Sequence, residues 1–280
     1  MTYLFLAVVI AFLSSASTEE KSTVLASNSD TISLATLYER LNDYDVAFVG
    51  EEHDSPEGHR AELELLSNLF DRDSTLVMGL EMFERDVQHV LDSYLAGEID
   101  ESAFLEGSRP WPNYETDYRP LVEFARSKGI PVVAANVPRR MASLVSRSGD
   151  FSPELFGEDS VYLPAAIDFD SKEYRERFMS TMEGMPHAGP MGAMNPENLF
   201  KAQALKDAVM ASSLSSWLER GRKVLFFCGR FHSDYHLGIP YQLEKSRPGL
   251  NIAVVTLLPY DSNVSGEEFS GVADFIMLCR

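Results

Sequence analysis

Four short apolar runs along the chain each stop where a polar side chain follows. The runs occupy residues 46–50, 76–80, 130–135 and the segment that ends at Gly229. Short apolar runs bounded in this way are typical of strands buried on both faces of a parallel sheet. Two more apolar runs, at residues 252–258 and 273–278, are expected to complete the sheet.

The segments between these runs carry the start and stop signals of helices. Ser55 is placed to cap a helix that has Pro56 at its first position, and Gly97 and Gly129 follow two further helical patterns. Strands that alternate with helices in this order are joined by right-handed parallel crossovers. The sequence therefore predicts an α/β fold with a mostly parallel central sheet flanked by helices.

The alternation is interrupted between about residues 150 and 221, where a helical insertion is expected. Residues 184–194 within it are rich in glycine, proline and methionine, a composition typical of a loop. This loop is a candidate lid over the strand ends. Its methionines and His187 could bind Cu(I) or pack on a flat apolar cofactor, but adaptable packing is the favoured interpretation.

Length and composition define the rest of the organisation. The chain has 280 residues, of which 45% are apolar, so residues 34–280 are expected to form one α/β domain after a polar linker at residues 18–33. The net charge of -19 disfavours nucleic acid as a partner, because no segment supplies a basic face.

An apolar stretch at residues 4–13 is followed by small residues, which predicts a signal peptide over residues 1–17. The stretch is too short to cross a membrane, so no integral span is expected in the mature chain. The chain is therefore expected to be exported.

Polar side chains follow the predicted strands at one edge of the sheet. Glu52 and His53 follow the first, Glu81 the second, Asn136 the third and His232 the fourth. Ligands of open α/β sheets bind outside the carboxyl ends of the strands, so these groups are expected to form one composite site.

The chemistry of this set admits two interpretations. Glu52, His53, Glu81 and His232 suit a divalent ion such as Mn, Fe, Co or Zn, which would activate a bound water. The same groups without a metal could act as a general base and its orienting partner. A competing structural interpretation is that the carboxylates cap helices and that the histidines bond to backbone.

Two other positions have open roles. Arg139 follows Pro138 at a predicted helix start, where a guanidinium and free backbone N–H groups could bind an anion, although a solvated basic turn would have the same sequence. His59 falls on the inward face of the helix that begins near Pro56, so a hydrogen-bonded core histidine competes with a ligand there.

Five motifs together resemble the ChaN-like haem-binding proteins, in the same order along about residues 40–260. That family belongs to a wider group that includes the Tiki metalloproteases and the erythromycin esterases. The motifs are Gly50-Glu-Glu-His53, Gly79-Leu-Glu81, the aromatic stretch 111–118, Asn136-Val-Pro-Arg139 and Gly229-Arg-Phe-His232.

The resemblance implies a periplasmic or cell-surface haem-binding protein of iron uptake or storage that binds haem at a homodimer interface. It implies a tyrosinate on the iron, for which Tyr118 is the first candidate and Tyr174 and Tyr162 follow. A histidine and a lysine near the propionates are also implied, and His187 and Lys172 are the candidates for them.

The alternative expectation is a metal-dependent hydrolase, an esterase or peptidase of the wider group. It would use Glu52, His53, Glu81 and His232 at the sheet edge.

Overall fold

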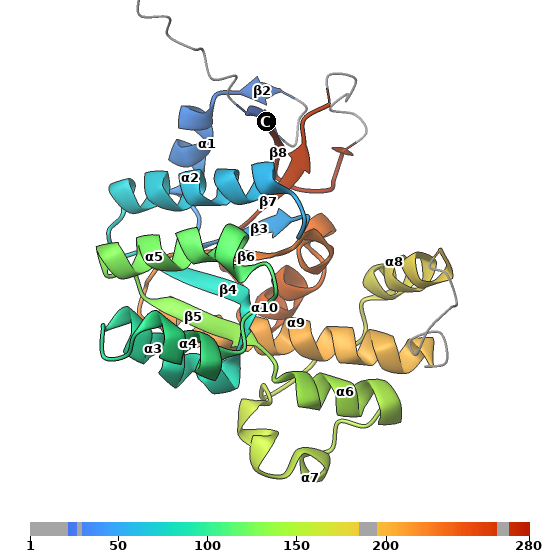
Figure 1. The fold of residues 1–280 in the computed structure, drawn as a ribbon. Helices are drawn as coiled ribbons and strands as arrows, with labels where there is room; N and C mark the ends of the chain where they lie inside the picture. The colour runs from blue at the N-terminus through green and yellow to red at the C-terminus, as the bar shows by residue number, and fades with distance from the viewer. Residues whose placement is uncertain (1–21, 27–29, 185–194, 262–268) are drawn as a thin grey trace, which may run out of the picture.

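The computed structural model describes residues 22–26, 30–184, 195–261 and 269–280 (Figure 1). Its centre is one sheet with the strand order β2-β1-β8-β7-β3-β6-β4-β5. The strands are β1 (Thr23–Ala26), β2 (Thr31–Ile32), β3 (Val46–Glu51), β4 (Val77–Glu84), β5 (Val132–Asn136), β6 (Val224–Gly229), β7 (Ile252–Pro259) and β8 (Phe275–Cys279). The six strands from β8 to β5 are parallel, which confirms the predicted sheet.

The sheet begins earlier in the chain than expected. Part of the predicted linker forms β1, which pairs antiparallel with β8 and with the short β2. Val24 is fully buried in this position. The apolar residues 24–26 therefore extend the sheet by edge pairing, and the linker prediction fails for this segment. The predicted signal peptide, residues 1–17, lies outside the described residues.

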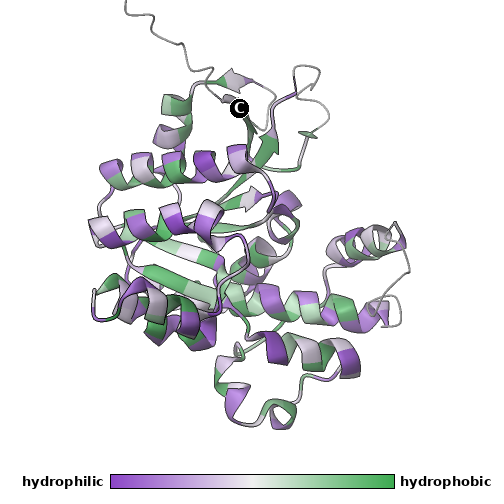
Figure 2. Cartoon of the chain, in the orientation of Figure 1, coloured by the Kyte–Doolittle hydropathy of each residue, from purple (hydrophilic) through white to green (hydrophobic). Residues whose placement is uncertain are grey.

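Helices cover both faces of the sheet (Figure 1). One face packs against a cluster of apolar side chains from α1 (Leu34–Leu41), α2 (Pro56–Arg72), α3 (Gln88–Leu95), α4 (Glu101–Ser108) and α5 (Arg119–Lys128). The other face packs against α9 (Pro196–Glu219) and α10 (Ile239–Ser246). The strands are mostly hydrophobic, whereas the helices alternate between hydrophobic and hydrophilic residues (Figure 2).

The helix boundaries follow from local signals. The Ser55 hydroxyl accepts a hydrogen bond from the Gly58 N–H at 3.1 Å, and Pro56 occupies the first position of α2. Gly129 ends α5 at φ 69°, a left-handed conformation that favours glycine. The predicted starts and stops are confirmed at these positions.

Between β5 and β6 the described residues form the helices α6 (Arg139–Ser148), α7 (Pro153–Phe156), α8 (Lys172–Glu183) and α9. This helical segment, called the insertion below, begins about ten residues before the predicted start near residue 150. Apolar side chains of α6, α7 and α9 pack into a cluster of their own, so the insertion is attached to the sheet mainly through α9. The glycine-rich segment with His187 lies outside the described residues.

Close packing at the strand ends depends on Gly50. A Cβ atom at this position would lie 2.6 Å from Ser233 Oγ and 2.9 Å from the Arg230 Cα, so any side chain would force the β6 end away from β3. Among the described residues, none of the helices combines the length and apolar character needed to cross a bilayer.

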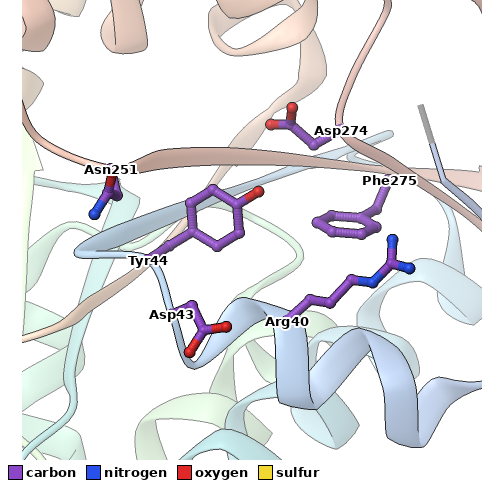
Figure 3. A pocket seen from close by; sticks show the side chains of 6 residues that line it. All are labelled: Arg40, Asp43, Tyr44, Asn251, Asp274 and Phe275. Atoms are coloured by element: carbon purple, nitrogen blue, oxygen red, sulfur yellow. The ribbon is translucent and has the colours of Figure 1, made fainter. Parts of the chain in front are cut away.

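A cavity of about 450 Å³ lies at the end of the sheet where the parallel strands begin (Figure 3). Tyr44 and Asn251 precede β3 and β7, and Phe275 begins β8, so this cavity lies at the amino ends of the parallel strands. Arg40 and Asp274 add mixed charge to it. It is therefore separated by the length of the strands from the carboxyl ends, where the polar residues gather.

Candidate functional site at the carboxyl edge of the sheet

A carboxylate and an imidazole form a pair at the end of β3. Glu51 is the last residue of the strand and is 1% exposed. His53 Nδ1 lies 2.7 Å from Glu51 Oε1, and the His53 side chain is 47% exposed. A buried carboxylate that holds Nδ1–H leaves Nε2 of the ring as the basic nitrogen.

A second imidazole lies between two carboxylates. His232 Nδ1 is 2.5 Å from Asp207 Oδ1 of α9, and His232 Nε2 is 3.2 Å from Glu81 Oε1 of β4. All three side chains are buried. This Asp207–His232–Glu81 chain is a buried charge network whose two acids hold one imidazole in a fixed orientation.

Gly229 separates the Glu51–His53 pair from the Asp207–His232–Glu81 chain. Its N–H donates to Glu81 Oε2 at 2.8 Å. A Cβ at Gly229 would lie 2.7 Å from His53 Cε1 and 2.9 Å from His53 Nε2. The glycine therefore allows the His53 ring to approach β6 and the Glu81 carboxylate.

The charges of the site follow from these contacts. Burial lowers the pKa of His232, but the Glu81 and Asp207 carboxylates raise it more, to about 10. Burial raises the pKa of Glu81, but the His232 imidazolium lowers it more, to about 2. The hydrogen bond to Glu51 raises the pKa of His53. At neutral pH His232 is thus a cation between two anions.

The two faces of the sheet supply different parts of this site. Val49 and Glu51 are two residues apart in β3 and share the face covered by α2 and α5. Glu81 points to the opposite face, where Asp207 approaches from α9. His53 and His232 both lie at the carboxyl edge because β3 and β6, the strands that precede them, end there.

Glu51, and not the predicted Glu52, is the carboxylate of β3 that contacts His53. Glu52 follows the strand and accepts a hydrogen bond from Arg230 Nη1 at 3.3 Å, away from His53. The predicted strand ends at Gly50, whereas β3 extends to Glu51, and the two-residue period puts that carboxylate in the core. His53, Glu81 and His232 do come together as expected.

A cavity of about 750 Å³ adjoins the two imidazoles. It lies between the β4 and β5 ends and the insertion helices α6, α8 and α9. Trp111 links it to the site, since the indole packs edge-on against His53 with ring centroids 4.9 Å apart and also lines the cavity. The other lining residues include Glu81, Asn136, Val137, Arg139, Ala142, Ser143, Phe178, Met182, Gln203, Lys206 and Phe231.

Two of the three predicted tyrosine ligands, Tyr118 and Tyr174, lie in the protein core. Tyr118 is fully buried and its hydroxyl donates to Glu51 Oε1 at 2.6 Å. Tyr174 is 3% exposed and donates to Asp207 Oδ2 at 2.7 Å. Burial and these carboxylates raise the pKa of both phenols far above the ordinary value. In this conformation both tyrosines hold the site carboxylates in place, and neither offers an oxygen to an iron.

The remaining candidates are spread around the insertion. Arg139 lines the cavity, and its Nε lies 3.8 Å from Glu84 Oε1. Lys172 is exposed at the start of α8. Tyr162 is half-buried against the α6–α9 cluster. The structure therefore brings Arg139, but not Lys172, to the cavity wall.

Two residues of the site had weak signals in the sequence. Asp207 is the only acid on an inward-facing stretch of α9 between Ala204 and Ala211, and a charge in such a stretch indicates a buried partner. Gln203, one turn earlier, places its Nε2 3.2 Å from His232 Nδ1 and 3.3 Å from the Tyr174 hydroxyl. Neither contact could be assigned without the position of α9 over the sheet.

A mostly parallel α/β sheet with paired carboxylates and imidazoles at its carboxyl edge defines a class of proteins that bind ligands at that edge. Residues 37–243 match the family described as haem-binding uptake, Tiki superfamily, ChaN. The chain belongs to this family.

Solved structures share the fold. The match to ChaN of Campylobacter jejuni, in a structure of cofacial haem binding, covers 94% of this chain and 98% of that one, with a TM-score of 0.70 and 17% identity. An erythromycin esterase mutant in its open conformation matches 88% of this chain and 78% of its own, with a TM-score of 0.50 and 13% identity.

One curated relative is protein RETICULATA-RELATED 5, chloroplastic, of Arabidopsis thaliana. It is 24% identical over 255 residues, which are 86% of this chain and 35% of the relative. The chain thus spans about a third of the length of that protein.

Proposed function

We propose that this chain binds haem in the 750 Å³ cavity beside the two imidazoles. The observation that carries the proposal is the composition of the cavity wall. Trp111, Phe178 and Phe231 supply flat aromatic surface, and Arg139 and Lys206 supply cations. Haem is a flat apolar ring with two carboxylates on one edge, so a cavity of this size with apolar walls and two cations suits it.

The side chains that line the cavity match the chemical groups of haem. Trp111 and Phe231 would pack on the porphyrin faces, and Arg139 and Lys206 would pair with its propionates. When bound, haem supplies iron and its redox chemistry, and here it would be cargo for iron uptake or storage. The insertion helices would exclude water from its apolar edge.

The axial ligand and the assembly are further parts of the proposal. Tyr118 and Tyr174 would each have to leave a carboxylate to reach an iron, so Tyr162 is the first tyrosine to test. It packs against the apolar cluster of α6, α7 and α9, two members of which, Ala142 and Ala202, also line the cavity. Cofacial haem binding in the Campylobacter jejuni protein supports a homodimer in which two chains enclose the haem. The proposal also includes export of the chain, so that it would bind haem outside the cytoplasm.

A haem titration of residues 18–280, followed by absorbance and by sedimentation, tests the proposal. Ser143→Trp is expected to fill the cavity and weaken haem binding by about 100-fold, because the new indole occupies the porphyrin space. Ser148→Trp on the exposed side of the same helix is the matched control and should bind as the unchanged chain does. Equal affinity for both variants would place haem elsewhere.

A second candidate function is hydrolysis of an ester or peptide, the alternative expected from sequence. The Glu51–His53 pair favours it, since a half-exposed imidazole oriented by a buried carboxylate is suited to act as a general base. His232, held as a cation beside Glu81, would stabilise negative charge on a nearby oxygen. Glu51 takes the role first given to Glu52.

His53→Ala separates the two functions. We expect this variant to keep haem affinity within about twofold, because the ring does not line the cavity, and to lose any esterase or peptidase activity by at least about 100-fold. Activity that survives the substitution would contradict the hydrolase function. A matched loss of haem affinity would show that His53 belongs to the haem site.

A further inference from the structure

A group of three ionisable side chains lies behind His53, outside the cavity wall. Glu51 of β3 and His59 and Glu62 of α2 have side chains that are 0%, 4% and 0% exposed. His59 Nδ1 lies 3.0 Å from Glu62 Oε2 and 3.4 Å from Glu51 Oε2. His59 and Glu62 are three residues apart, so they share one face of α2 and meet the strand end together.

One oxygen of each acid in this Glu51–His59–Glu62 group lacks the hydrogen-bond partner that a buried carboxylate oxygen requires. Glu51 Oε2 and Glu62 Oε1 are buried, and neither has a hydrogen-bond partner among the described residues. Burial and the Glu51 charge raise the pKa of Glu62 well above its ordinary value. Two adjacent buried carboxylates need either a trapped proton or a cation.

The surroundings orient His59 as a ligand. Its Nε2 lies 3.3 Å from the His53 carbonyl oxygen and 3.6 Å from Asp117 Oδ2. Asn113 Nδ2 donates to both of these oxygens, at 3.1 and 2.7 Å. These two acceptors favour the tautomer with the proton on Nε2, which directs the Nδ1 lone pair at the two carboxylates, as in metal sites where an outer acceptor fixes the tautomer.

We propose that Glu51, His59 and Glu62 bind a divalent cation of the series from manganese to zinc. Their ligand atoms all lie within 4.8 Å of one another. Neighbouring ligand atoms around such an ion are about 3 Å apart, which agrees with the two distances from His59 Nδ1. Two carboxylates neutralise the ion, and an imidazole favours this series over calcium or magnesium.

The site would act on the carboxyl edge through Glu51. One oxygen of this carboxylate holds His53 and Tyr118, and the other faces His59. A cation on the second oxygen would fix the carboxylate and, with it, the His53 ring. None of the three ligands lines the large cavity, so this inference is independent of haem binding.

Metal analysis of residues 18–280 tests the inference. The protein is unfolded with chelator, refolded with Mn²⁺ or Zn²⁺, desalted, and assayed for metal by elemental mass spectrometry and for melting temperature. We expect about one ion per chain and a higher Tm than after refolding with chelator, because metal that binds only the folded state stabilises it. No retained metal and an unchanged Tm would overturn the proposal.

Variants assign the ion to its ligands. Glu62→Gln is close in shape and should fold with or without metal, but retain at least tenfold less of it. Glu64→Gln, on the exposed face of α2, and His89→Gln, an exposed histidine, are matched controls that should retain the ion. If Glu62→Gln keeps the metal and Glu81→Gln loses it, the ion binds beside Glu81 and His232, and its assignment to Glu51, His59 and Glu62 is wrong.

Discussion

Asp207→Ala is expected to lower the free energy of unfolding by about 3–5 kcal/mol, the largest effect of any single substitution we foresee. The substitution would leave the buried His232 cation with one acid, and it would remove the acceptor of the Tyr174 hydroxyl. Both groups stay buried in the folded protein, so neither can recover its lost partner from water. Urea unfolding followed by circular dichroism gives the difference.

The control lies on the same helix. Glu197→Ala removes an exposed carboxylate that pairs with Arg175, and exposed pairs contribute about 0.5 kcal/mol or less. A loss below about 1 kcal/mol for Asp207→Ala would mean that His232 is neutral in the folded protein. The buried charge network described here would then be incorrect.

The stability of the protein is expected to fall between pH 6.5 and pH 10 because of His232. The folded-state pKa of this group, about 10, is above that of a free imidazole, so its stabilising effect is complete below pH 6.5 and is lost as the pH approaches 10. A pKa change of this size corresponds to about 5 kcal/mol of stability, which His232 shares with Glu81 and Asp207.

His232→Gln isolates this contribution from other titrating groups. The difference in unfolding free energy between the unchanged chain and the variant should shrink steadily from pH 7 to pH 10, as measured by urea unfolding at each pH. His89→Gln, at an exposed position, should show no such trend. A difference that stays constant over this range would mean that folding does not raise the pKa of His232.

The sheet and its polar edge were predictable because they depend on local pattern. Each signal is local. An apolar run, a glycine that ends a helix and a polar residue after a strand can each be recognised from a few neighbouring positions. Glu81 and His232 were found in this way. The choice of Glu52 over Glu51 shows the limit of such reasoning, since a strand longer by one residue reverses which side chain enters the core.

The rest of the site depends on tertiary contacts that no local pattern contains. Asp207 reaches His232 because α9 crosses the sheet after a long insertion. Tyr118 is a ligand candidate by its aromatic neighbours, but the fold turns its hydroxyl to Glu51, in the core. An aromatic cluster in sequence cannot distinguish a tyrosine that faces a ligand from one that donates a hydrogen bond to a buried carboxylate.

The large cavity and the imidazoles are built from different parts of the chain. The walls come mainly from α6, α8 and α9, whereas His53, His232 and Glu81 come from the strand ends and their loops. Substitutions in α6 and α8 can therefore change which molecule enters the cavity without disturbing the hydrogen bonds of His53, His232 and Glu81. In this arrangement the selectivity of the cavity and the acid–base properties of the strand ends can be altered independently of each other.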